Sequence, residues 1–350
     1  MNTVSLAAPP GLLRGPIFDS GFIVGIAVVA VAAGLAVTAQ PDLFWPILAL
    51  DLWILGYHHV VATFTRLAFD HESFREHRRL VLYLPLVVAG AVTAIALTAG
   101  LWLLVSIYLY WQWFHYARQS EGISKAYAGR SRGKDIGDSR LTRLMFYSVP
   151  IAGILAVSAR QPQEFLLMPV KTFPVPHWLA FAAIIVAAVL CFAWLVMQIR
   201  AFKRGRLAVP YVAYMTSHFV MFAFAYLWLA EINYGWLAIN MWHNAQYILF
   251  VWLFNNRRFN GAIDPERVFL STISQNGRFA LYIGVCLTLS TFIYFLVQHI
   301  GIDALSRSLG VSVTAAAIII YQTLNFHHYV VDAVVWKLRK PKLRNNLGLS

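Results

Sequence analysis

Long apolar stretches dominate the chain, and short polar stretches separate them. A helix that crosses a membrane needs about 20 apolar residues. None of the stretches shows the sustained alternation typical of a strand, and the membrane interior accepts only helices or closed barrels. The ten predicted membrane helices are 20–39, 43–69, 79–97, 99–118, 141–159, 177–200, 209–231, 233–255, 278–299 and 310–336.

The polar stretches between these helices are too short for a soluble domain. The longest, 119–140, is rich in Gly, Ser and Arg and is predicted to be a cytoplasmic loop, while 337–350 is predicted to be a basic cytoplasmic tail. We therefore expect residues 1–350 to form a single transmembrane domain. The predicted fold class is all-α, a polytopic bundle of about ten transmembrane helices.

Composition and charge agree with this fold and orient it. Charged residues make up 12% of the chain, against about 25% in soluble domains. With the N-terminus inside, 25 of the 28 Lys and Arg residues fall in inner segments and 3 in outer loops. Because Lys and Arg collect in cytoplasmic loops, both termini are predicted to be cytoplasmic, in a bacterial-type inner membrane. The net charge of +13 then reflects orientation and contact with membrane lipids, and does not require nucleic acid.

Histidines are the main candidate functional residues. Most of the eleven lie within predicted helices, and several lie about nine to twelve residues from an inner end, or roughly 13–18 Å deep. His115 is shallower. Ionisable groups inside a membrane are costly and usually face a partner or a cavity. The predicted metal ligands are His58, His59, His115, His218, His243, His327 and His328.

Imidazole suits iron, copper and zinc, and the two cysteines lie within apolar segments, which argues against an iron–sulfur site. His71 and His77, in the short loop after the second helix, are additional candidate ligands, although a solvated loop explains them equally well. The chain has no His-Glu-x-x-His motif, so a zinc protease is not expected.

Ligand histidines usually donate their second N–H to a carboxylate or carbonyl group. Several polar residues lie at helical spacing from the histidines and are therefore predicted to orient them. They are Asp332, Gln246, Gln112, Tyr247, Tyr214 and Asp51.

Four segments together resemble a known family. They are LGYHHVVATFTR (55–66), WQWFHYARQSEG (111–122), INMWHNAQYILFVW (239–252) and NFHHYVVDAVVWKLRKP (325–341). In order and character they are similar to motifs of the Brp/Blh group of bacterial membrane β-carotene dioxygenases. The resemblance implies a polytopic membrane enzyme whose histidines bind an iron that activates O₂. It implies that His58, His115 and His243 are iron ligands, with His327 and Asp332 keeping the spacing of the last motif.

The chain departs from the family pattern at several positions. Tyr57 stands where the family has Pro, His59 where it has Gly, and Ala62 where it has Asp. Tyr247 replaces the second His of the third motif. His59 and His218 have no counterpart, and either is a candidate for the missing ligand.

With the resemblance, we expect a His-ligated membrane oxygenase or desaturase that holds one or two non-haem irons, with copper as an alternative metal. It would act with O₂ on a lipid-soluble substrate such as a carotenoid or an acyl lipid, with an electron donor as a further partner. A proton-coupled transporter that uses the histidines as a relay is one alternative. A haem- or quinone-binding membrane protein is another.

Overall fold

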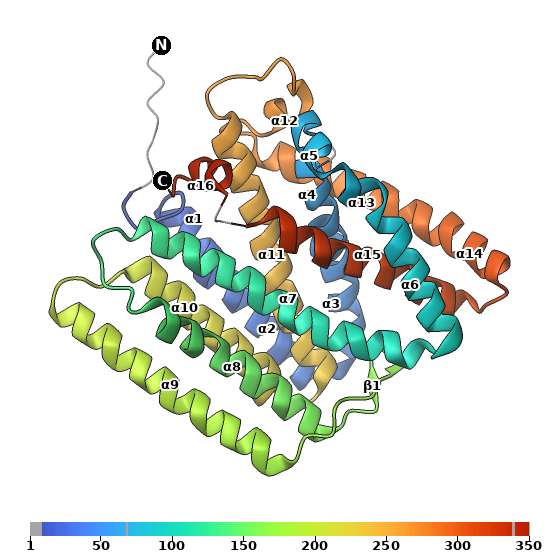
Figure 1. Ribbon diagram of the computed structural model, residues 1–350, viewed down its shortest axis with the longest axis horizontal. Helices are drawn as coiled ribbons and strands as arrows, with labels where there is room; N and C mark the ends of the chain where they lie inside the picture. Colours follow the sequence, from blue (N-terminus) through green and yellow to red (C-terminus); the bar gives the residue numbers. More distant parts are fainter. Residues whose placement is uncertain (1–8, 68, 338–339, 350) are drawn as a thin grey trace.

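The computed structural model describes residues 9–67, 69–337 and 340–349. About 80% of the structure is helical, and the helices assemble into one bundle (Figure 1). The all-α prediction is confirmed. The strands in this part of the chain form one short hairpin, in which β1 (Glu164–Phe165) pairs antiparallel with β2 (Met168–Pro169).

Among the described residues, six helical stretches are long and apolar enough to cross a membrane, and they indicate a membrane protein. Three of them contain a short π-helical turn, and one begins with a 3₁₀ turn. The stretches consist of α1 (Pro16–Ser20), η1 (Gly21–Gly25) and α2 (Ile26–Ala39); η2 (Pro41–Leu43), α3 (Phe44–Asp51), η3 (Leu52–Gly56) and α4 (Tyr57–Leu67); α5 (His71–Leu82) and α6 (Leu84–Thr98); α8 (Ser139–Arg160); α9 (His177–Lys203); and α13 (Phe279–Leu296), η5 (Val297–Gly301) and α14 (Ile302–Leu309).

The other predicted segments are also helical, but they carry more polar residues. These helices are α7 (Leu101–Arg130), α10 (Val209–Ala223) with the π turn η4 (Phe224–Trp228), α11 (Ile232–Phe259) and α15 (Val313–Val335). Helix α11 packs against α2, α4 and η4, so most of its side chains are buried. Two short helices, α12 (Val268–Ile273) and α16 (Pro341–Asn346), lie after α11 and α15.

Helix α11 approaches η4 unusually closely, and a glycine permits this. A Cβ atom on Gly235 would lie 2.0 Å from the carbonyl oxygen of Ala225, well inside van der Waals contact. Any larger residue at this position would push the central helix away from its neighbour.

The six predicted inner segments, which hold most of the basic residues, lie at one end of the bundle, which we call the basic end. Their described residues are 14, 66–67 and 69–79, 118–143, 200–206, 257–278, and 337 with 340–344. Contacts join each segment to another, so their common location does not depend on the view. The contacts pair Arg14 with Asn256, Asp70 with Arg258, Arg130 with Leu12 and Gly348, Asp135 with Arg206, Arg257 with Leu347, and Lys340 with Glu76.

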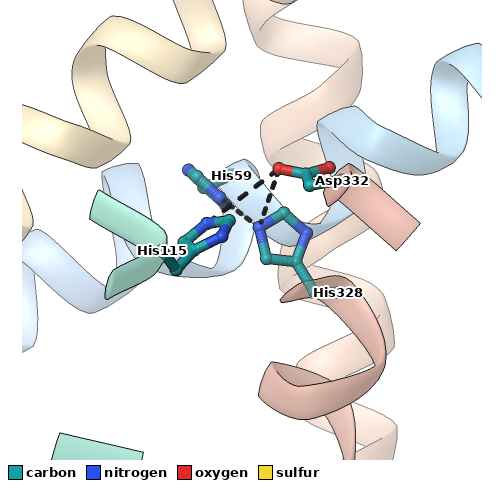
Figure 2. Close-up of side chains that lie close together, drawn as sticks. All are labelled: His59, His115, His328 and Asp332. Carbon is teal, nitrogen blue, oxygen red and sulfur yellow. Dashed lines mark hydrogen bonds and ion pairs between the residues drawn. The ribbon is translucent and has the colours of Figure 1, made fainter. Parts of the chain in front are cut away.

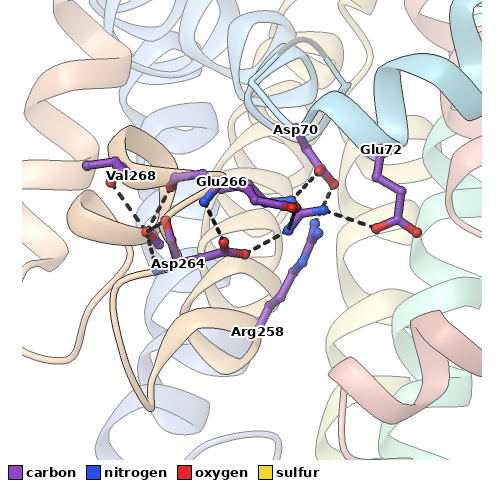
Figure 3. Close-up of polar contacts among 8 residues, drawn as sticks. Asp70, Glu72, Arg258, Asp264, Glu266 and Val268 are labelled. Atoms are coloured by element: carbon purple, nitrogen blue, oxygen red, sulfur yellow. Dashed lines mark hydrogen bonds and ion pairs between the residues drawn. The ribbon is translucent and has the colours of Figure 1, made fainter.

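An ion-pair network closes part of the basic end (Figure 3). Asp70, between α4 and α5, accepts hydrogen bonds from Arg258 at 2.6 Å and from Arg267 at 2.7 Å. Arg267 also contacts Asp264 at 2.7 Å and Glu72 at 3.2 Å. Burial by itself raises the pKa of Asp70, but the two arginines outweigh it and hold that pKa below its ordinary value. The network therefore fixes the turn before α5 to the loop before α12.

Two predicted polar segments differ from expectation. Helix α7 continues to Arg130, so the predicted loop 119–140 begins only at residue 131. The small side chains that suggested a loop are instead packed against other helices, as Ser120 shows by its bonds to α10. In the tail, α16 buries Leu343 and Leu347 against the bundle. Residues 338, 339 and 350 of the predicted tail lie outside the described residues.

Candidate metal centre

Three histidines and one aspartate from three helices converge inside the bundle (Figure 2). His59 comes from α4, His115 from α7, and His328 and Asp332 from α15. Each offers one ligand atom, and these atoms all lie within 4.8 Å of one another. All four side chains are buried. We call this set the His₃Asp cluster.

The distances within the cluster suit a single metal ion. The Nε2 atoms of His59 and His328 are 2.6 Å apart, and Asp332 Oδ2 lies 3.4 Å from His328 Nε2 and 4.0 Å from His115 Nε2. Metal bonds of about 2.1 Å place neighbouring ligand atoms roughly 3 Å apart and opposite ones roughly 4.2 Å apart. Shifts of about half an ångström would therefore bring the four groups onto one ion.

Hydrogen bonds outside the cluster orient two of its members. Trp336 Nε1 donates to the Tyr247 hydroxyl at 3.0 Å, and that hydroxyl donates to Asp332 Oδ1 at 2.8 Å. The Thr63 hydroxyl lies 2.7 Å from the Tyr247 oxygen and 3.2 Å from His328 Nδ1. Because Tyr247 gives its proton to Asp332, Thr63 donates to Tyr247 and accepts from His328 Nδ1–H. His328 Nε2 then keeps its lone pair for the cluster, as a metal ligand requires.

A fourth histidine lies beside the cluster without joining it. The His243 ring is centred 4.9 Å from the rings of both His59 and His115, and the Tyr116 ring covers it at 4.0 Å. His243 Nδ1 and His115 Nε2 are both buried and have no hydrogen-bond partner in the part of the chain that the structure describes. Unpartnered buried nitrogen atoms are costly, which points to a ligand at this place.

Repeated four-residue spacing builds the site, because residues four apart share one face of a helix. The sequence predicted the pairs His243–Tyr247 and His328–Asp332. It did not single out Thr63 and Trp336, although the same spacing applies to both. The pairs are His59–Thr63, His243–Tyr247, His328–Asp332 and Asp332–Trp336.

A cavity of about 710 Å³ opens beside the cluster. His115, Asp332 and Tyr247 contribute to its wall, together with aromatic side chains from α7, α11 and α15. The candidate metal centre therefore adjoins a cavity within the range of about 300–1,000 Å³ that is typical of pockets for small organic ligands.

No family model, curated protein or solved structure matches the chain. The resemblance to the Brp/Blh group stays a prediction, and the interpretation of the site rests on its side chains.

In the first histidine pair, the structure brings His59 rather than His58 to the cluster. His58 is buried, and its Nε2 has no hydrogen-bond partner among the described residues. The π turn Leu52–Gly56 accounts for the difference. In a regular α-helix His58, seven residues after Asp51, would share its face. The wider π turn takes up one extra residue and places His59 there instead.

In the second pair, His328 joins the cluster and His327 points elsewhere. The Nε2 atom of His327 lies 2.8 Å from the carbonyl oxygen of Leu80, and its ring stacks on Phe64. Neighbouring residues on a helix diverge by about 100°, so only one of the two can face the centre. Asp332, predicted to orient a ligand, belongs to the donor set itself.

His218 was predicted as a ligand but lies in a separate polar site. Its Nδ1 lies 2.9 Å from Ser120 Oγ and its Nε2 lies 3.0 Å from the Phe146 carbonyl oxygen, so both ring nitrogens are satisfied. Tyr214 contacts Ser120 at 3.0 Å and donates to Gln246 at 3.2 Å. Tyr214 and Gln246 thus support the His218 site rather than the His₃Asp cluster.

His71 and His77, the additional candidates, also lie away from the cluster. His71 is exposed at the start of α5. His77 contacts the Ser73 carbonyl oxygen at 3.0 Å and Lys340 at 3.4 Å. The first contact lies within α5, and the second ties α5 to the C-terminal segment at the basic end.

Asp51 and Gln112, predicted to orient ligands, belong to a buried network next to the cluster. Asn240 donates to Asp51 at 2.6 Å, and Gln112 donates to the Tyr116 hydroxyl at 2.7 Å. Tyr116 in turn donates to Asn240. Because the Tyr116 ring covers His243, the network reaches the metal centre through ring packing, without a hydrogen bond to a cluster histidine.

Proposed function

We propose that this protein is an integral membrane oxidoreductase that uses non-haem iron and O₂ to oxidise a lipid-soluble substrate. The observation that carries the proposal is the His₃Asp cluster, buried among helices at the wall of an aromatic cavity. Its chemistry supports iron, because imidazole and carboxylate ligands with open positions suit ferrous oxygenases. Copper is the alternative metal.

Iron held there would supply O₂ activation. The residues of the chain would do the rest. His59, His115, His328 and Asp332 would hold the ion, and the Trp336–Tyr247–Asp332 hydrogen bonds would fix the carboxylate. The aromatic wall would exclude water, which strengthens electrostatic interactions in the site and limits side reactions. His243 would be a further donor at the cluster's edge.

For the topology, we propose ten membrane-spanning helices with both termini in the cytoplasm of a bacterial-type cell. The contacts among the six basic segments support it, since they bring together nearly all the Lys and Arg residues at one end. An even number of crossings puts both termini on that side. The cavity then opens toward the cytoplasm, where an electron donor is accessible.

Metal analysis of protein purified without oxygen tests the proposal. We expect one or two irons per chain, and we expect a strong chelator to remove them. In the absence of added substrate, O₂ consumption should require both the iron and a reductant. Protein that is fully active after complete metal removal would overturn the proposal. A Soret band would favour the haem alternative, and chelator-insensitive proton flux in proteoliposomes would favour the transporter.

A further inference from the structure

The cavity beside the cluster has two chemically different ends. Near one end, the cluster residues His115 and Asp332 line it together with aromatic side chains that lie on both sides of them. These aromatic residues are Trp111, Phe114, Phe250, Tyr329 and Trp336. Such a wall fits an apolar chain rather than a compact polar molecule.

One side of the cavity wall reaches the outer surface of the bundle between α7 and α15. Phe114 lines the cavity, yet 48% of its surface is exposed, and Ala333 on α15 is exposed as well. Both helices run with their C-terminal ends toward the basic end (Figure 1). An apolar chain can therefore enter from the lipid side without crossing the polar surface.

The other end of the cavity, toward the basic end of the bundle, is strongly basic, and we call it the basic mouth. The cationic side chains that line it are Arg118, Lys125, Arg143, Lys337 and Arg344. Besides Asp332, Glu121 is the one carboxylate among the described lining residues. The cations therefore exceed the carboxylates by three.

Glu121 neutralises only part of this charge. It pairs with Arg118, with Lys125 at 2.6 Å and with Arg143 at 3.1 Å. Burial alone raises the pKa of Glu121, but Lys125, Tyr147 and Arg118 outweigh it and hold that pKa below its ordinary value. Lys337 makes no ion pair with any described residue, and the described polar contact of Arg344 is to the Leu349 carbonyl oxygen.

Helix α7 sets the distance between the two ends. Arg118 and Lys125 follow His115 by three and ten residues, or by roughly 4.5 and 15 Å along the axis. A group bound by Arg118 or Lys125 would thus lie within about three helical turns of the cluster. A molecule that is apolar throughout would leave Lys337 and Arg344 without an anionic partner among the described residues.

We propose that the substrate is an amphiphile, with an apolar chain that reaches the cluster and an anionic headgroup, carboxylate or phosphate, held by the basic mouth. This substrate class rests on the proposed function. It differs from the neutral carotenoids on which the Brp/Blh group acts. Arginine and lysine recognise both anions through charge-assisted hydrogen bonds. A free fatty acid and an anionic phospholipid share this chemistry.

Equilibrium binding to the full-length protein in neutral detergent tests the proposal. The probes are radiolabelled palmitate, phosphatidic acid and hexadecanol, and the last shares the chain of palmitate but has no charge. We expect at least one anionic probe to bind tenfold or more tightly than hexadecanol. Preference for palmitate identifies a fatty-acid site, and preference for phosphatidic acid identifies a phospholipid site.

Two double variants localise the binding. Lys337→Gln with Arg344→Gln removes two mouth cations and should weaken anionic binding at least tenfold, with little effect on hexadecanol. The matched control is Arg132→Gln with Lys134→Gln. These exposed basic residues lie at the basic end but do not line the cavity, and we expect less than a twofold change.

The iron content of each sample separates this inference from the proposed function. If the protein contains no iron but still binds the anionic probes more tightly than hexadecanol, the proposed substrate class is supported and the proposed oxidoreductase function is overturned. Iron-loaded protein that binds hexadecanol as well as it binds the anionic probes would overturn the substrate class alone. Equal weakening by both double variants would also overturn it, because general contact with lipid headgroups then explains the charge.

Discussion

The His₃Asp cluster and the His218 site hold histidines that are equally well buried but differ in their partners. Both nitrogens of His218 meet protein groups, a hydroxyl and a carbonyl oxygen, and its ring stacks on Phe146 at 3.7 Å. His115 Nε2 in the cluster and Nδ1 of neighbouring His243 are buried and find no such partner among the described residues. Burial therefore does not identify a ligand histidine. What separates the two regions is whether the ring nitrogens are already satisfied.

The strongest test uses the adjacent histidines of α15. His328→Ala should reduce bound metal at least tenfold, because it removes a central donor. His327→Ala is the matched control and should retain the metal, since its ring contacts the Leu80 carbonyl oxygen. Metal analysis after purification measures both. Similar metal content in the two variants would place the ion elsewhere.

The same contrast exists in α4. His59→Ala should lose the metal and His58→Ala should keep it, because the π turn places only His59 in the cluster. The reverse result would mean that the helix is regular at Leu52–Gly56 and that the resemblance-based assignment of His58 holds.

His218→Ala should lower stability and leave metal content unchanged. It removes two hydrogen bonds and a stacked ring from a buried site, so we expect a loss of about 2–4 kcal/mol in the free energy of unfolding. Thermal unfolding in detergent measures the effect. A folded His218→Ala variant that has lost its metal would show that the His218 site also contributes to metal binding.

Tyr247→Phe tests the orientation of the cluster with a smaller change. The variant keeps the ring but removes the hydroxyl that joins Asp332, Thr63 and Trp336. Loss of a group that orients a ligand typically weakens metal affinity about 10–100-fold. Chelator competition gives the affinity. An unchanged value would show that Asp332 is positioned by its own helix alone.

The ion-pair network around Asp70 should give the smallest effect, and it depends on pH. Because the two arginines lower the pKa of this carboxyl group, its stabilising contribution is complete above the ordinary value of about 4. It is lost as the pH falls through the folded-state pKa. We expect Asp70→Asn to cost about 1–3 kcal/mol at pH 7 and to reduce the acid dependence of thermal unfolding. Glu266→Gln, an exposed neighbour of Arg267, should change neither.

The sequence was sufficient to predict helices and their polar faces, since apolar length and four-residue spacing are local properties. It also predicted His115, His59 and His328 as ligand candidates. It could not separate each histidine from its neighbour, because a π turn shifts the helical face by one residue without a clear sequence signal. The choice between His58 and His59 required the three-dimensional structure of the helix.

The position of His218 shows a second limit. Counting residues from a helix end gives depth but not direction around the bundle, and two histidines at equal depth can face different helices. The helical residues of 119–130 show a third, because Gly and Ser suggested a loop where small side chains allow close helix packing. Both outcomes depend on contacts between distant parts of the chain.

The C-terminal segment forms part of the cavity wall through Arg344 and Leu349, and Arg130 holds it by the Gly348 carbonyl oxygen. A guest in the cavity would touch this segment as well as the helices, and so would favour its docked form. Protease cleavage or amide hydrogen exchange near residues 340–349 should slow when the cavity fills. Protection of residues 340–349 would thus report whether the cavity is occupied, without an assay of any reaction.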